Sequence, residues 1–109
     1  MEIYNSHCFY FLDIANGAPL QEIPGDQVLC DLSKTFVGGA MYLGVELGLT
    51  RETIVQILAK DEKDLFKQNL GVLKEWKFSK QHEATILMLM KAFQWVDGKG
   101  LAFLIEKYR

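Results

Sequence analysis

The sequence predicts an all-α protein, a bundle of six helices that follows an irregular N-terminal extension. After Gly25, apolar residues recur every three or four positions, the spacing of an amphipathic helix, and no segment there indicates a convincing strand. Half of the 109 residues are apolar, so one domain of this length can bury a continuous core. We therefore expect an extension over residues 1–25 and a single helical domain over residues 26–109.

The extension differs from the rest of the chain. Its first half is rich in aromatic residues, and its second half is broken by Gly17, Pro19, Pro24 and Gly25. Such residues favour turns over continuous helix or strand. We expect one short ordered segment that ends in a turn, with the aromatic side chains lying on the domain or on a neighbouring chain.

The first three predicted helices are short. Asp26 is placed to cap the first, because an aspartate oxygen can accept from free backbone N–H groups. Glycines 38–39 are expected to end that helix. The second is predicted over residues 40–47 and stops at Gly48, since glycine accepts a positive φ without a Cβ penalty. Thr50 is then expected to cap the third helix.

The other three helices are predicted over residues 60–78, 82–96 and 101–108. Their apolar residues follow the i, i+3, i+4, i+7 spacing of one buried face. The helix over 82–96 also carries apolar residues off that face, which indicates a place in the middle of the domain. We expect both tryptophans, Trp76 and Trp95, to be buried, with an interface anchor as the alternative, above all for Trp95.

The cysteines and histidines do not indicate chemistry. Cys8 and Cys30 lack a CxxC spacing, so we expect a reduced pair, with a disulfide between them as the alternative. His7 lies next to Cys8 in sequence, but adjacency does not make a nucleophile and base face each other. We read these residues as ordinary members of the extension.

Other catalytic, metal and membrane signatures are also missing from the sequence. Asp61, Glu62 and Asp64 lack the glycine and the spaced ligands of a calcium loop, and are expected to be solvated carboxylates near a helix start. The glycines form no phosphate-binding pattern, and no apolar run reaches about 18 residues. The sequence therefore predicts no catalytic residue, no cofactor, no metal and no membrane partner.

Charge is unevenly distributed. Residues 1–62 carry a net −6 and residues 63–109 a net +4. On a helical wheel, four lysines of the later half fall within about 80°, and a fifth extends the patch into the next loop. A solvated face is one reading; the other is a partner-binding surface opposed by acids of the first half. The lysines are Lys63, Lys67, Lys74, Lys77 and Lys80, and the acids are Asp26, Asp31, Glu46, Glu52, Asp61 and Glu62.

Three segments resemble one family. "LGLTRETIVQI" over residues 47–57 resembles the junction between helices 2 and 3 of the death domain, the six-helix module of apoptotic and innate-immune signalling. Residues 73–76 resemble its Leu-x-x-Trp segment, and residues 83–93 with 100–105 resemble its last two helices. The segments occur in the family's order and spacing over residues 26–108.

Two positions depart from the family pattern. Ala40 stands where many death domains carry tryptophan, and Gly44 stands where alanine is common. Because glycine within a helix costs about 1 kcal/mol relative to alanine, we expect the second helix to be loose or distorted. The N-terminal 25 residues have no counterpart in the family pattern.

The resemblance implies an antiparallel Greek-key bundle, the death fold, and a cytoplasmic adaptor without enzymatic activity. It also implies other death-domain proteins as partners, including a homo-oligomer of this chain. One alternative is a structural or autoinhibitory helical domain of a larger protein. A helical nucleic-acid-binding domain that uses the lysines is a weaker alternative, because a net charge of −2 gives no global attraction to phosphates.

Overall fold

The computed structural model describes residues 18–36 and 39–108. All regular structure in these ranges is helical, with six α-helices and no strand, which confirms the prediction of an all-α protein. The elements are η1 (Ala18–Gln21), α2 (Asp26–Ser33), α3 (Ala40–Glu46), α4 (Arg51–Lys60), α5 (Leu65–Lys80), η2 (Gln81–Glu83), α6 (Ile86–Val96) and α7 (Gly98–Tyr108).

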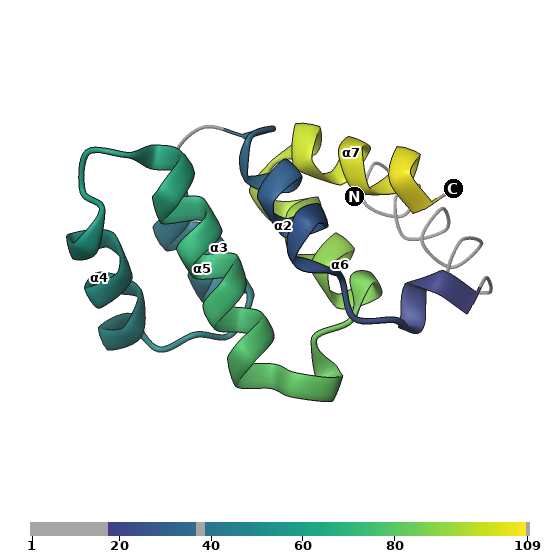
Figure 1. Cartoon of the computed structure of the whole chain (residues 1–109), viewed down its shortest axis with the longest axis horizontal. Helices are drawn as coiled ribbons and strands as arrows, with labels where there is room; N and C mark the ends of the chain where they lie inside the picture. Colours follow the sequence, from purple (N-terminus) through teal and green to yellow (C-terminus); the bar gives the residue numbers. More distant parts are fainter. Residues whose placement is uncertain (1–17, 37–38, 109) are drawn as a thin grey trace.

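The long helix α5 lies at the centre of one group of packed helices. It packs against α2, α3 and α4, while α6 packs against α7, α3 and the short helix η1. Figure 1 shows α4 at one end of the molecule and α7 toward the other, with α2 and α5 between them. Since both groups share α3, they enclose one continuous core.

The short helix η1 and all six α-helices contribute buried apolar side chains to the core. The Phe36 and Phe93 rings meet edge to face, with centroids 5.0 Å apart, an arrangement that aromatic pairs favour. The other large side chains of this cluster are aliphatic apart from one tryptophan. The most deeply buried are Leu20, Leu29, Leu32, Leu43, Val72, Leu73, Trp76, Ile86, Leu89, Met90 and Leu104.

The two tryptophans have different environments. Trp76 is 2% exposed and belongs to the core, as predicted, but Trp95 is 45% exposed and Met88 is 48% exposed. The expectation that Trp95 is buried is therefore wrong. Met88 and Trp95 are seven positions apart and therefore lie on the same side of α6. Helices α3, α7 and η1 pack against its other sides.

The packed core begins before residue 26. Leu20 in η1 is fully buried, and the Ile86 amide at the start of α6 donates to the Glu22 carbonyl at 2.9 Å. The buried Leu20 side chain and this backbone hydrogen bond therefore hold residues 20–22 against the domain. The aromatic residues predicted to cover the domain lie outside the described residues.

Helix α2 begins and ends differently from the expectation. Gly25 occupies its N-cap position without a side-chain bond, and Asp26 is its first helical residue, so Asp26 is not the cap. The helix ends at Ser33, well before glycines 38–39. The Ser33 and Thr35 hydroxyls donate to the backbone carbonyls four and three residues earlier, and such bonds compete with helix continuation.

Polar caps define the starts of three later helices. Thr50 Oγ1 accepts from the Thr53 amide at 3.2 Å, which confirms the predicted cap of α4. Asp64 and Thr85 accept in the same way from amides three residues on. They make α5 and α6 begin at Leu65 and Ile86, later than the expected residues 60 and 82.

Helix α3 is a continuous α-helix rather than the loose or distorted one expected. Gly44 is buried at its contact with α4, where a Cβ would lie 2.7 Å from both Cδ1 and Cγ1 of Ile54. The glycine therefore lets the fully buried Ile54 reach the α3 backbone. Gly48 follows at φ +85°, consistent with its predicted role in ending this helix.

Candidate protein-interaction surface

The described residues contain no group of three or more histidine, cysteine, aspartate or glutamate side chains that could hold a metal ion. Cys30 is a half-buried free thiol on α2, whereas Cys8 and His7 lie outside the described residues. No helix within the described ranges combines the length and apolar character needed to cross a bilayer. The charged surface of α5 is the candidate site.

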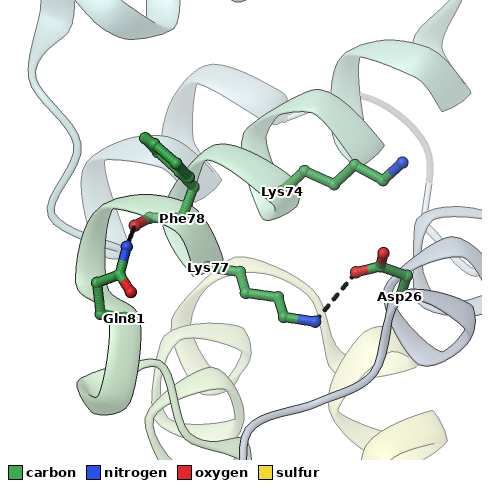
Figure 2. A pocket seen from close by; sticks show the side chains of 5 residues that line it. All are labelled: Asp26, Lys74, Lys77, Phe78 and Gln81. Carbon is green, nitrogen blue, oxygen red and sulfur yellow. Dashed lines mark hydrogen bonds and ion pairs between the residues drawn. The ribbon is translucent and has the colours of Figure 1, made fainter.

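An open depression lies between the C-terminal half of α5 and the start of α2. We call it the α5 hollow; it has a volume of about 430 Å³ and is lined by Asp26, Lys74, Lys77, Phe78 and Gln81. Figure 2 shows the two lysines extending from α5 toward Asp26 on α2, with the Phe78 ring on the opposite side. The hollow thus combines two cations, one anion and one aromatic ring.

An ion pair crosses the hollow. Lys77 Nζ lies 3.0 Å from Asp26 Oδ1, with the lysine side chain 30% and the aspartate side chain 73% exposed. The hydrogen bond from Lys77, its positive charge and, to a smaller extent, that of Lys74 lower the pKa of Asp26 below its ordinary value of 3.8. The pair joins two residues 51 positions apart in sequence.

The lowered pKa of Asp26 predicts a pH-dependent contribution to stability. A carboxyl group whose pKa is lower in the folded state stabilises the fold above its unfolded value, and this contribution is lost as pH falls through the folded value. The wild type is therefore expected to be more stable than Asp26→Asn at neutral pH. The difference should shrink below pH 3.8.

Urea unfolding of both proteins between pH 7 and pH 2 measures this difference. Added salt should reduce it at neutral pH, because the pair is exposed and screened by ions. A stability gap that is the same at every pH and salt concentration would show that the ion pair does not contribute.

The C-terminal end of α5 has an unusual geometry. Phe78 is 72% exposed, far more than most large aromatic side chains. Gln81, the residue after the helix, has a positive φ of 55°, a costly backbone conformation for a residue with a Cβ. Its Nε2 donates to the Phe78 carbonyl at 2.7 Å, which satisfies an acceptor that the ending helix leaves free.

The five predicted lysines do not all lie on α5. Lys67, Lys74 and Lys77 lie on α5, but Lys63 precedes the helix and shares the α4–α5 turn with two of the predicted acids, Asp61 and Glu62. The helical wheel therefore does not apply to Lys63. Opposite charges are adjacent in this turn rather than segregated to separate surfaces.

Lys80 lies away from the hollow. Its Nζ is 3.3 Å from the position that a Cβ on Gly48 would occupy. The ammonium group therefore lies at the C-terminal end of α3, where the helix dipole favours a positive charge. Lys80 therefore lies between α5 and the α3–α4 junction, and it is not among the residues that line the hollow.

The remaining acids differ in their availability. Asp31 is half-buried on α2, and its Oδ1 accepts from Gln27 Nε2 at 2.9 Å. Glu46 on α3 and Glu52 on α4 are exposed. Glu52 lines a second, mostly apolar depression with Arg51, Val55 and Gln56, so a carboxylate adjoins apolar surface there.

Sequence reasoning named the two lysines of the hollow and the carboxylate of Asp26, but it missed Phe78 and Gln81. Phe78 could have been noticed, because it is an apolar residue outside the apolar stripe of its helix. Asp26 was read as a cap and as one of the acids of the first half, but its ion pair with Lys77 was not predicted. No local pattern indicates the backbone conformation of Gln81. Comparison with known protein families and with curated proteins finds no match to this chain.

Proposed function

We propose that this chain is a non-enzymatic protein-interaction module of the death-fold type, an antiparallel Greek-key bundle that acts in the cytoplasm. It binds other death domains by homotypic, charge-complementary contacts in apoptotic or innate-immune signal transduction. The six-helix architecture and the buried Trp76 support this proposal. So do the three sequence segments that resemble the family.

The observation that carries the proposal is the α5 hollow. An exposed aromatic ring next to lysines is the composition of a binding hot spot, where an aromatic anchor supplies contact area and charges select the partner. Because Phe78 is 72% exposed, it contributes little buried apolar surface to the fold of the isolated chain. Contact with a partner would remove this apolar surface from water.

The chain also exposes carboxylates outside the hollow. Glu46 and Glu52 are exposed on α3 and α4, near the exposed side chains of Val45 and Val55 along those helices. An acidic, partly apolar surface on one molecule complements the basic, aromatic hollow of another. Because the two surfaces differ, the association is head-to-tail and includes copies of this chain as well as other death domains.

Charge reversal in the hollow tests the proposal. Lys74→Glu is expected to weaken binding to a death-domain partner at least about tenfold, because it replaces attraction by repulsion at the contact. Lys91→Glu is the matched control, since Lys91 is an exposed lysine on α6 outside the hollow. Binding of both variants to a panel of purified death domains is measured by isothermal titration calorimetry.

Both variants should unfold at nearly the wild-type temperature, because exposed charges contribute little to stability. Equal binding by wild type and Lys74→Glu would contradict the proposed surface. Equal losses of affinity in Lys74→Glu and Lys91→Glu would show that binding depends on the net charge of the protein and not on the hollow. Failure of every death domain to bind the wild type would contradict the proposed class of partner.

A further inference from the structure

We infer that Asp26 is an internal competitor for the α5 hollow, and that a carboxylate-bearing segment of a partner protein displaces it from Lys77. The inference deepens the proposed function and rests on it for the class of partner. It names carboxylates as the groups that bind in the hollow. It also states that the ion pair between Asp26 and Lys77 has to break before a partner carboxylate can bind Lys77.

The ion pair is unequal in a way that favours exchange. The Asp26 side chain is 73% exposed and the Lys77 side chain only 30%. Asp26 can therefore turn into water with little change in its surroundings. The lysine stem remains held between the helices and keeps its ammonium group in the hollow.

The hollow has more positive than negative charge among its lining residues. Lys74 and Lys77 extend toward the single carboxylate of Asp26 (Figure 2), and Lys74 also acts on Asp26 electrostatically. A partner segment with two acidic side chains can satisfy both ammonium groups. Asp26, a single short side chain fixed to α2, forms a direct bond only with Lys77.

The shape and composition of the hollow indicate the rest of the ligand. Its volume of about 430 Å³ lies within the range of sites that hold small ligands or a few side chains. Phe78 borders it on the side away from Asp26 (Figure 2), so an apolar residue next to the acids has a ring to pack against. The lysines are point charges without the planar fork of arginine, which suits separate carboxylates.

The competition predicts an unusual result, a substitution that strengthens binding. Asp26→Asn is expected to bind an acidic ligand about two- to fivefold more tightly than the wild type, because no intramolecular ion pair has to break. The probe is a fluorescein-labelled peptide, Gly-Glu-Glu-Phe-Glu-Glu-Gly, with its all-glutamine counterpart as the neutral reference. Fluorescence anisotropy at low salt measures its dissociation constant.

Three controls separate competition from general charge effects. Glu22→Gln makes the same change in net charge four residues earlier in the chain, at an exposed carboxylate that does not line the hollow, and should leave the affinity unchanged. In a Lys77→Gln background, Asp26→Asn should no longer improve binding, because the ammonium group for which Asp26 and the peptide compete is absent. Asp26→Glu should restore an affinity close to that of the wild type.

Several outcomes would overturn the inference. They are equal or weaker binding of the acidic peptide by Asp26→Asn, an equal gain in Glu22→Gln, or no binding of the peptide by either protein. The same titrations with whole death domains keep the two proposals distinct. If the peptide shows the predicted pattern and no death domain binds, the proposed class of partner fails and the competition stands.

Discussion

Gly100→Ala is expected to destabilise the protein by about 2–3 kcal/mol, because added volume in a packed core forces neighbouring side chains out of place. A Cβ at this position would lie 2.4 Å from Cδ1 and 2.6 Å from Cε1 of Phe93. Phe93 is fully buried and its ring already packs against Phe36, so it cannot move aside freely. Urea unfolding followed by circular dichroism measures the loss.

Gly98→Ala is the matched control for this substitution. Gly98 is in the same helix, two residues earlier, and a Cβ there meets nothing within 4 Å. Alanine should therefore stabilise the protein by about 0.5–1 kcal/mol through its higher helix propensity and the less flexible unfolded chain. If both alanine variants shift stability in the same direction, α7 does not approach Phe93 as closely as the structure shows.

Trp76→Ala is expected to have the largest effect on stability, a loss of about 3–5 kcal/mol. The side chain is 2% exposed and belongs to the main cluster of buried residues, so its removal leaves a large cavity between helices. Domains of this size are stable by about 5–15 kcal/mol in total. A substantial unfolded fraction at 37 °C, detected by thermal unfolding, is the expected result.

Phe78→Ala provides the contrast on the same helix. Phe78 is two residues beyond Trp76 but 72% exposed, so its removal should change stability by no more than about 0.5 kcal/mol. The same variant should weaken partner binding, because Phe78 is the aromatic edge of the α5 hollow. Similar stability losses for Trp76→Ala and Phe78→Ala would contradict the assignment of one to the core and the other to a binding surface.

Much of the fold could be predicted from periodicity and glycine positions. The apolar spacing identified all six α-helices, and Gly48 and Thr50 marked the α3–α4 junction correctly. Helix starts were less predictable where a polar cap such as Asp64 lies within a charged run. The close contacts at Gly44 and Gly100 are made with residues of other helices. A local sequence pattern does not predict such contacts.

The candidate site was predictable only in part, because charge on a helical wheel identifies an exposed face and not its neighbours. Lys74 and Lys77 were identified in this way. The pairing of Lys77 with Asp26 arises because α2 packs against α5, and the contact of Lys80 with Gly48 because the end of α5 reaches the α3–α4 junction. Both are consequences of helix packing.

The most direct test of the central claim is light scattering coupled to size exclusion, applied to the wild type, Lys74→Glu and Lys91→Glu over a salt series. The proposed head-to-tail contact predicts concentration-dependent assembly of the wild type and Lys91→Glu at low salt, reduced as salt is added. Lys74→Glu should remain monomeric. Assembly of Lys74→Glu equal to that of the wild type at every salt concentration would contradict the claim that the α5 hollow is the contact surface.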